Sequence, residues 1–346
     1  MKTVNIGVIG AGGIATNAHL PAYEACPNAK VVAIADINEE ALNKAKEKFS
    51  IPNAFTDYHD LLAMEEVEAV SICTPNFMHK QPAIDAMRAG KHVLIEKPLA
   101  MNAIEAQEIV DVAKETGQKC QVAFVMRFDA QAKVLKRFID AGEMGGIYYG
   151  RAQMLRRRGI PGWGVFGQKD KQGGGPLIDL GVHVLDLTLW LMGNKKPVSV
   201  SGISVTKFGN REGVVGLMGQ WDVSTFTVED FGAGFIRFDD GSVLLLEASF
   251  AANIKGNSLS QISLLGDQGG ADMYPLAVYR EDHGVLLDIT PQFVEPTKGF
   301  ELEIQAFCDA IINDTPVVVP VEDGLTVNKI IDGIYKSAEL GREVEI

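Results

Sequence analysis

The 346-residue sequence has few cysteines, few basic residues and no long apolar run. Its four cysteines are Cys26, Cys73, Cys120 and Cys308. They form no C-x-x-C pair and no Cys/His spacing of the kind that binds zinc. Because a chain of this length can build a core without disulfide bonds, we expect four buried, reduced thiols.

No segment is apolar for long enough to cross a bilayer, which takes about 20 residues in a helix. The longest apolar runs, such as Val4–Ile9 and Leu185–Met192, fall far short of that length. The N-terminus also lacks the apolar core and small-residue cleavage site of a secretory signal peptide. We therefore expect a cytoplasmic protein with no membrane partner.

Acidic residues outnumber basic ones by 45 to 32, which gives a formal net charge of −13. A protein of that charge repels nucleic acid and anionic lipid, so neither is an expected partner. The composition is 47% hydrophobic and 22% charged, which excludes a disordered or fibrous chain. Glycine is in excess at 36 residues, and such an excess often accompanies tight turns and close backbone approach to a ligand.

The first 125 residues alternate strand and helix patterns with short connections. Continuous apolar runs predict buried parallel strands at Val4–Ile9, Val31–Ala35, Ala69–Cys73, His92–Ile95 and Gln121–Val125. Helical patterns extend from the first strand to about Ala25 and then cover Asn38–Phe49, Pro82–Ala89 and Ala103–Thr116. This order predicts an α/β fold over residues 1–125, a doubly wound parallel sheet with right-handed crossovers.

From about residue 126 the strand patterns change to alternation with period two. Strands are predicted at Ile147–Leu155, Val198–Val205, Gly232–Phe238, Ser242–Phe250 and Leu259–Leu265, with helices at Ala130–Ala141, Leu177–Met192, Phe300–Asn313 and Thr326–Leu340. A hairpin turn is expected at Phe238–Ser242. Residues 126–346 are therefore predicted to form an α+β domain with a large, open, mostly antiparallel sheet.

A glycine-rich turn joins the first predicted strand to the first helix. Residues 10–15 read G-x-G-x-x-A, in which Gly10 permits a tight turn and Gly12 lets a pyrophosphate approach the backbone. Small Ala15 allows close helix–strand packing. Gly13 and Ile14 lie where the free N–H groups of a helix N-terminus would face phosphates. The turn therefore predicts dinucleotide binding.

Asp36 ends the second predicted strand, about 20 residues past the turn, where a ribose-binding acid is expected. A carboxylate accepts hydrogen bonds from both ribose hydroxyls but repels a 2′-phosphate. The next residues, Ile37, Asn38 and Glu39, are not basic. The sequence therefore favours NAD over NADP as the cofactor.

Two further strand ends carry polar clusters, which read Thr74-Pro75-Asn76 and Glu96-Lys97-Pro98. Ligands of open α/β sheets bind outside the carboxyl ends of strands, so we expect both clusters in the cofactor site. Lys97 would stay charged beside Glu96 or have its pKa lowered by desolvation. Either state suits alkoxide stabilisation or proton transfer.

These motifs together resemble the Gfo/Idh/MocA family of nicotinamide-dependent oxidoreductases, which includes glucose-fructose oxidoreductase and inositol dehydrogenases. The likeness is carried by Gly10–Ala15, Asp36, Thr74-Pro75-Asn76 and Glu96-Lys97-Pro98. It implies an N-terminal Rossmann domain and a C-terminal substrate-binding and oligomerisation domain over essentially the whole chain, assembled as a homo-dimer or homo-tetramer. It also implies that Lys97 belongs to the catalytic site, beside the nicotinamide.

The predicted helix after the glycine run at 173–175 is apolar almost all round, yet it carries Asp179, His183 and Asp186. At about 100° per residue these three fall within an arc of about 60°. Buried ionisable groups are costly unless they face a polar cleft or pair with one another. The resemblance implies that Asp179 and His183 are catalytic, whereas Asp186 is as well explained as a structural partner. No third strong ligand is evident, so we expect no metal site.

This set of residues suits oxidation of a secondary alcohol. Neutral His183 can take the hydroxyl proton as hydride leaves the carbinol carbon for the nicotinamide. Asp179 can orient the imidazole or bind a neighbouring hydroxyl, and Lys97 can stabilise the developing oxyanion.

Other polar side chains are candidates for substrate binding. Arg127 follows the fifth predicted strand, and Arg156 belongs to a basic cluster that would bind a polyol, a carboxylate or a phosphate. Pairing with acidic residues or an oligomer interface explains this cluster equally well. Trp163 lies on a Gly/Pro-rich loop as a platform for a sugar ring or as a packing residue. We expect His19 and His79 to be structural.

The leading hypothesis is an NAD-dependent dehydrogenase that acts on a secondary CH–OH of a sugar, sugar derivative or cyclitol. A second hypothesis keeps NAD bound and uses transient oxidation to drive elimination or glycoside hydrolysis. A third is a dinucleotide-binding regulatory protein without turnover. A regulator has no need for Lys97, Asp179 and His183 together, so the sequence favours an enzyme.

Overall fold

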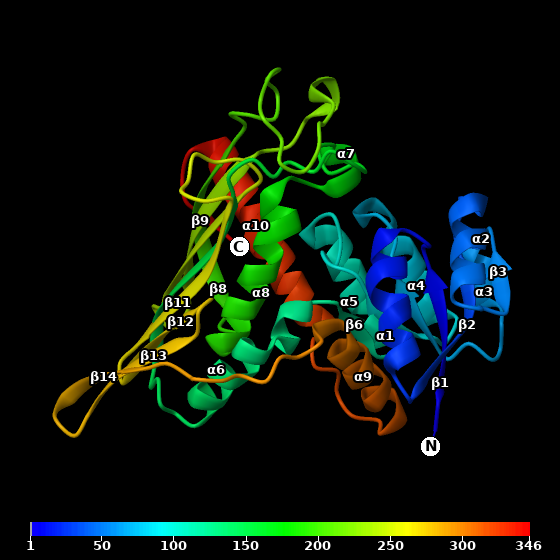
Figure 1. The fold of residues 1–346 in the computed structure, drawn as a ribbon, viewed down its shortest axis with the longest axis horizontal. Helices are drawn as coiled ribbons and strands as arrows, with labels where there is room; N and C mark the ends of the chain where they lie inside the picture. The colour runs from blue at the N-terminus through cyan, green and yellow to red at the C-terminus, as the bar shows by residue number, and fades with distance from the viewer. Residues whose placement is uncertain (1) are drawn as a thin grey trace. The chain divides into compact units, whose positions relative to one another are not determined.

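The structure is a computed structural model and describes residues 2–346. Its chain divides into two compact units. The first unit consists of Met1–Phe128 and Lys298–Leu325, and the second of Asp129–Thr297 and Thr326–Ile346 (Figure 1).

The first unit contains a six-stranded sheet in which every neighbouring pair is parallel. The strands are β1 (Val4–Ile9), β2 (Ala29–Ala35), β3 (Asn53–Phe55), β4 (Ala69–Ile72), β5 (His92–Ile95) and β6 (Cys120–Val122). Their order, β3-β2-β1-β4-β5-β6, is that of a doubly wound dinucleotide-binding fold. The predicted parallel sheet is confirmed, although the three-residue strand β3 was not predicted.

Helices connect these strands and begin at side-chain caps in several places. They are α1 (Leu20–Ala25), α2 (Glu39–Lys48), α3 (Tyr58–Leu62), α4 (Lys80–Arg88) and α5 (Ala103–Thr116), with the π-helical turn η1 (Ala15–His19) before α1 and the 3₁₀ turns η2 (Asn76–Met78) and η3 (Val125–Phe128). Asn38 caps α2 by accepting the Ala41 N–H, and Asn102 caps α5 by accepting the Glu105 N–H. The strand predicted to reach Val125 ends at Val122, because the chain turns toward η3 there.

The first unit also takes up the helix α9 (Gly299–Ile312), which the predicted division at residue 126 assigned to the other domain. Ile304, Phe307 and Cys308 of α9 belong to the same buried cluster as the strand residues Ile6 and Val8. Burial of this apolar face against the parallel sheet explains why a segment so late in the sequence completes the first unit.

The second unit contains a nine-stranded sheet in the order β14-β13-β12-β11-β7-β10-β9-β8-β15. The strands are β7 (Ile147–Arg156), β8 (Pro197–Val205), β9 (Phe231–Phe238), β10 (Val243–Ser249), β11 (Ser258–Gly266), β12 (Gly269–Met273), β13 (Ala277–Asp282), β14 (Val285–Ile289) and β15 (Val344–Glu345). Only β7 and β10 pair in parallel, which confirms the mostly antiparallel sheet. The expected hairpin joins β9 to β10, with Phe238 donating its N–H to the Ser242 carbonyl.

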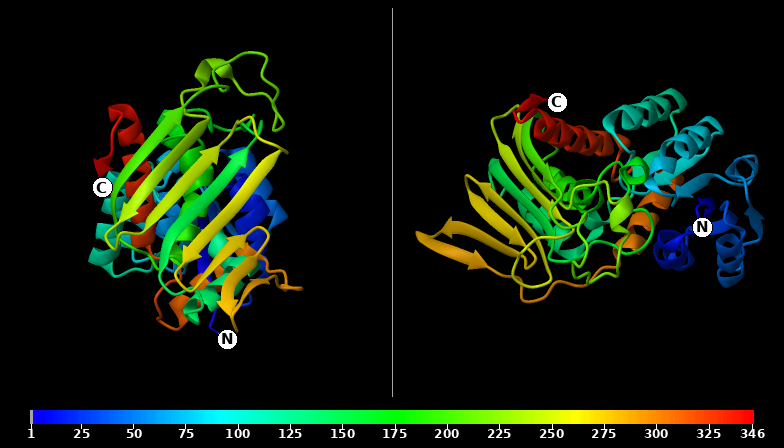
Figure 2. Two further views of the ribbon diagram at one scale, coloured as in Figure 1. Left: turned by 90° about the vertical axis from the view of Figure 1, so that its left-hand side faces the viewer. Right: turned by 90° about the horizontal axis from the view of Figure 1, so that it is seen from above.

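The longer helices of the second unit lie on one face of its sheet (Figure 1). The helical segments of this unit are α6 (Ala130–Asp140), α7 (Lys169–Gln172), the π-helical turn η4 (Leu177–Gly181), α8 (Val182–Leu191) and α10 (Val321–Leu340). A 3₁₀ turn, η5 (Val223–Thr225), lies in a loop. The helix α10 belongs to this unit from Thr326 onward. Side chains of α8 pack closely on the strands here, since a Cβ at Gly150 would lie 3.1 Å from Cγ2 of Thr188. The left view of Figure 2 shows the other face, which carries none of the helices described above.

Candidate functional site

The loop after β1 has the backbone geometry of a phosphate-binding turn. Gly10 has a left-handed φ of +102°, and a Cβ there would lie 2.7 Å from the Cys73 carbonyl oxygen. A Cβ at Gly12 would meet nothing within 4 Å, so the backbone at this position borders open space. Gly13 and Ile14 then lead into η1, where the first N–H groups of a helix have no carbonyl partner in their own helix.

Asp36 follows the last residue of β2, and its carboxylate fixes two loops. Oδ2 accepts the Ala11 backbone N–H at 2.6 Å, and Oδ1 accepts the Asn38 N–H at 2.8 Å. A carboxylate oxygen has a second lone pair, so Asp36 keeps acceptor capacity for a ribose hydroxyl.

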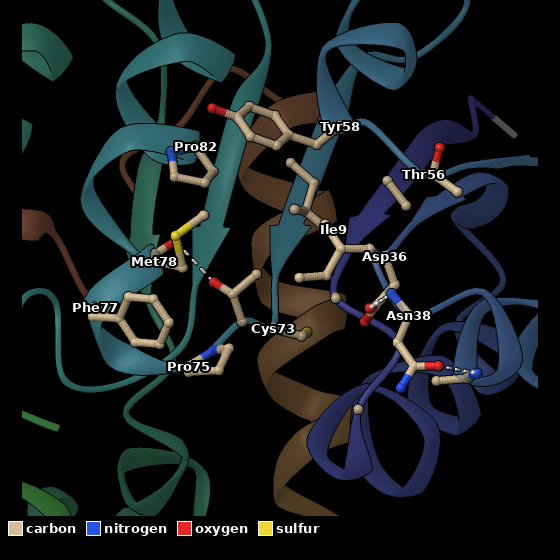
Figure 3. A pocket seen from close by; sticks show the side chains of 16 residues that line it. Ile9, Asp36, Asn38, Thr56, Tyr58, Cys73, Pro75, Phe77, Met78 and Pro82 are labelled. Atoms are coloured by element: carbon tan, nitrogen blue, oxygen red, sulfur yellow. Dashed lines mark hydrogen bonds between the residues drawn. The ribbon is translucent and has the colours of Figure 1, made fainter. Parts of the chain in front are cut away.

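A pocket of about 360 Å³ lies between the glycine loop and the segment after β4 (Figure 3). Asp36 borders one side of it, and Tyr58, Phe77, Met78 and Pro82 contribute apolar surface. The Tyr58 hydroxyl donates to Asp85 Oδ2 at 2.7 Å, which fixes the ring. An apolar pocket beside a carboxylate has the chemistry to hold the base and ribose of an adenosine moiety.

Thr56 and Tyr58 supply a part of this pocket that no sequence motif predicted. They follow β3, which is too short at three residues to give a periodic apolar signal. Asp57 is the residue that could have indicated this strand end, because its side chain accepts the His59 N–H and caps α3. A capped helix start after a short apolar stretch indicates a strand end, where ligands of such sheets bind.

The Thr74-Pro75-Asn76 segment partly lines the pocket. Thr74 and Pro75 are pocket residues, whereas Asn76 begins η2. Thr74 donates from Oγ1 to the Met78 carbonyl at 2.9 Å, and its own carbonyl lies 2.9 Å from the His79 ring. These bonds hold the loop closed on itself beside the glycine turn.

Glu96 is buried and does not have the environment predicted for a cofactor contact. Its Oε1 lies 2.8 Å from His19 Nε2, and its Oε2 accepts the Lys97 backbone N–H at 3.0 Å. Both oxygens therefore bond within the first unit. Lys97 is half-buried, although every neighbour from Val93 to Glu96 and from Pro98 to Ala100 is buried.

The polar positions of the second unit's apolar helix differ from one another in exposure. Asp179 and His183 are half-buried and are the only residues between Leu177 and Leu189 that are not buried. Asp186 is fully buried. Asp179 and His183 therefore keep some solvent exposure, as a site residue needs. The full burial of Asp186 fits the alternative that it is a structural partner.

This helix begins as the π turn η4 rather than as an α-helix, so the predicted arc at 100° per residue does not apply between Asp179 and His183. Glu229 anchors its start: Oε2 accepts the Gly175 N–H at 2.9 Å and Oε1 accepts the Leu177 N–H at 3.1 Å. Tyr335 also donates to Oε1, at 2.9 Å. Burial raises the pKa of Glu229. No sequence motif pointed to this acid, which lies 52 residues from Leu177 in the chain.

Arg127 does not have the environment predicted for a substrate-binding residue. Its side chain is 1% exposed and donates to Asp323 Oδ2 at 2.8 Å and to the Val318 carbonyl at 3.4 Å. A guanidinium desolvated to this degree requires such partners, so the arginine holds the chain segment before and within α10.

Arg156 and Trp163 both lie in the second unit with some exposure. Arg156 is half-buried and donates to the Gly159 carbonyl at 3.2 Å. Burial lowers the pKa of Arg156, and the charge of Asp179 opposes that shift. Trp163 is 56% exposed and meets the Phe166 ring edge-on, with 6.4 Å between ring centroids.

Across residues 2–346, no group of three or more His, Cys, Asp and Glu side chains is arranged to hold a metal ion. The helices of the same described range include none that is long and apolar enough to span a membrane.

Family models match nearly the whole chain. Residues 4–124 match the oxidoreductase family with an NAD-binding Rossmann fold, and residues 136–346 match the C-terminal α/β domain of the same family.

The individual proteins to which the chain is similar include several dehydrogenases. The chain is 33% identical over 343 residues to a D-glucoside 3-dehydrogenase of Escherichia coli (strain K12), covering 99% of this chain and 97% of the relative. It is 29% identical to an scyllo-inositol 2-dehydrogenase (NAD(+)) of Bacillus subtilis (strain 168), covering 86% and 83%. A solved levoglucosan dehydrogenase in complex with NADH superposes with a TM-score of 0.87 at 25% identity, covering 100% and 99%.

Proposed function

Because this chain belongs to the Gfo/Idh/MocA oxidoreductase family, whose N-terminal domain is an NAD-binding Rossmann fold, we propose that it oxidises a secondary CH–OH of a sugar, sugar derivative or cyclitol. The observation that carries this proposal is the likeness, over nearly the full chain, to dehydrogenases named for a glucoside and an inositol. The open backbone at Gly12 and the Asp36 carboxylate beside an apolar pocket fit NAD.

The chemistry divides between the bound cofactor and the side chains. NAD, when bound, supplies the hydride acceptor. We assign His183 as the base that takes the hydroxyl proton, Asp179 as the group that orients it or binds a neighbouring hydroxyl, and Lys97 as the cation that stabilises the oxyanion. The partial exposure of all three, among buried neighbours, supports these roles.

Arg156 and Trp163 are the proposed substrate contacts, since each retains exposed surface in the second unit. Gly10, Gly12, Gly13, Ile14, Asp36, Thr74, Pro75 and Asn76 are the proposed cofactor contacts. Asp36 supports a preference for NAD over NADP, because a carboxylate repels a 2′-phosphate.

We also propose a cytoplasmic homo-dimer or homo-tetramer. The four cysteines are free and buried, which fits a reducing compartment. The helix-free face of the nine-stranded sheet includes Leu245, flanked across the strands by Phe235 and Arg151, and a second copy of the chain would cover it.

The test incubates the purified protein with NAD⁺ and a panel of glucosides, aldoses and inositols while absorbance is followed at 340 nm. We expect turnover, and losses of about 10²–10³-fold in kcat for Lys97→Met and about 10²–10⁴-fold for His183→Ala. NAD affinity should change little in both. Lys114→Met, at an exposed lysine of α5, is the control and should keep wild-type kcat.

Unchanged turnover in Lys97→Met or His183→Ala would remove these residues from the catalytic site. Cleavage of an aryl glucoside without net cofactor reduction would favour transient oxidation followed by elimination. Sugar binding without any turnover would favour the regulatory alternative. The relatives carry dehydrogenase names, so neither alternative is favoured by the comparisons.

A further inference from the structure

Both chain neighbours of Lys97 are held by buried histidines. Glu96, before it, bonds to His19, and the carbonyl of Pro98, after it, lies 2.7 Å from His79 Nδ1. Both histidines are buried, at 0% and 1% exposure. The half-buried lysine therefore extends from a backbone that is fastened on both sides.

The two ring nitrogens of His19 contact side chains in different directions. Its Nε2 lies 2.8 Å from Glu96 Oε1, and its Nδ1 lies 3.0 Å from Ser71 Oγ, which also meets the Tyr23 hydroxyl at 3.0 Å. Burial lowers the pKa of His19, but Cys73 and Glu96 outweigh burial and hold the pKa well above its ordinary value. This direction favours a charged His19 opposite the buried Glu96 carboxylate.

The contact to Glu96 continues directly to the lysine. Glu96 Oε2 accepts the backbone N–H of Lys97 at 3.0 Å, so the two oxygens of one carboxylate join the histidine to the peptide of the lysine. His19 itself is the last residue of η1, the turn that follows the glycine loop. This pair thus links the helix that faces the dinucleotide phosphates to the strand end that bears the lysine.

We propose that His19, acting through Glu96, is a positioning residue that fixes Lys97 relative to the cofactor helix. The proposal rests on the function proposed above for Lys97. Ser71 lies within β4, and its contact with His19 does not pass through Glu96, so it serves as the comparison contact.

Two substitutions separate these contacts. His19→Gln places an amide nitrogen near the position of Nε2 and can still donate to Glu96, whereas His19→Asn places one near Nδ1 and can reach only Ser71. A displaced catalytic group costs up to about 10²-fold in rate. We expect His19→Asn to lower kcat at least about tenfold with NAD affinity and KM nearly unchanged, and His19→Gln to restore most of kcat.

A second pair keeps the test decisive if His19→Asn does not fold. Glu96→Gln should lower kcat, because it removes the charge that His19 balances, and Ser71→Ala should leave kcat at the wild-type level. Thermal melts of all variants report losses of stability separately. Equal effects of His19→Asn and His19→Gln on kcat, or a normal kcat in Glu96→Gln, would overturn the proposal.

A readout independent of turnover distinguishes this proposal from the catalytic assignment. Acetic anhydride labels amines, and peptide mass spectrometry gives the labelling of Lys97 relative to exposed Lys114 in the holoenzyme. We expect the ratio to change in His19→Asn and not in His19→Gln, and an unchanged ratio in both contradicts positioning. If Lys97→Met kept full turnover, the catalytic assignment would fail while this ratio still tested the positioning role.

Discussion

Asp36 uses its two carboxylate oxygens to join the glycine loop to the loop after β2, through the N–H groups of Ala11 and Asn38. The same carboxylate borders the pocket that we propose for the adenosine moiety of NAD. We therefore propose that Asp36 couples the shape of the pocket to the choice between a ribose hydroxyl and a 2′-phosphate.

Asp36→Ala should weaken NAD binding by about tenfold or more, which corresponds to about 1.4 kcal/mol, and should improve NADP relative to NAD. The acceptor for the ribose hydroxyls is lost together with the charge that repels the phosphate. Asp129→Ala is the matched control, since Asp129 also accepts two backbone N–H groups but lies in the second unit. Titration calorimetry with both dinucleotides measures the ratio of affinities, and an unaltered ratio would defeat the ribose argument.

The buried His19–Glu96 pair should give stability a defined pH window. Burial raises the pKa of Glu96, but the bond and charge of His19 outweigh it and lower the pKa below 4.5, so this contribution is lost as acid protonates the carboxylate. The pKa of His19 is raised above 6.5, so its contribution is lost as pH rises through the raised value. The pair should stabilise fully between about pH 4.5 and 6.5.

Glu96→Gln should therefore destabilise the protein most within this window, by about 3–5 kcal/mol, because it leaves the histidine without its charge partner. The difference from wild type should shrink below about pH 4. Thermal melts across pH 3–9 measure it. A difference that does not vary with pH would show that the pair is not ionised in the folded state.

Within the glycine loop, we expect Gly10 to be needed for folding and Gly12 for cofactor binding. A Cβ at Gly10 would collide with the Cys73 carbonyl and would require a left-handed φ, whereas a Cβ at Gly12 meets no protein atom. Gly10→Ala should lower the melting temperature by several degrees. Gly12→Ala should melt near wild type but bind NAD at least about tenfold more weakly, because the methyl group takes space needed by the pyrophosphate.

Thermal melts and NAD titrations on both variants check this contrast. Gly90→Ala serves as a control for a left-handed glycine with no neighbour within 4 Å. It should lose stability by strain alone and keep normal NAD affinity. Normal NAD binding in Gly12→Ala would mean that the pyrophosphate does not approach this backbone.

Elements with a strong local signal were predicted closely from the sequence, and weak or nonlocal ones were not. The apolar runs of β1 and β5 and the capped helix α5 have the predicted bounds. The hairpin strands β13 (Ala277–Asp282) and β14 (Val285–Ile289) were missed, because polar and exposed residues obscure their alternation.

The same distinction applies to the site. Local motifs predicted the glycine turn, and the half-buried state of Lys97, Asp179 and His183 fits their proposed roles. The burial of Arg127 depends on Asp323, and the anchoring of η4 depends on Glu229; both partners are distant in sequence. No periodicity within one segment can reveal such pairings.

For the whole molecule, the helix-free face of the nine-stranded sheet determines the expected assembly. Leu245 lies centrally on it, opposite Phe235 on β9 and Arg151 on β7. Leu245→Glu should dissociate the proposed homo-oligomer, because a buried unpaired charge at an interface is costly. Sedimentation velocity measures the mass, with Ile104→Glu, at an exposed position of α5, as the control. A monomeric wild type, or an oligomer unaffected by Leu245→Glu, would contradict this surface.

The proposed reaction is direct hydride transfer from a carbinol carbon of a sugar to NAD. The most direct test uses a substrate from the active panel with deuterium on the oxidised carbon, followed by mass spectrometry of the reduced cofactor. Direct hydride transfer predicts one deuterium in the reduced nicotinamide and a slower rate with the labelled sugar. Reduced cofactor without deuterium, or deuterium released only to solvent, would contradict it.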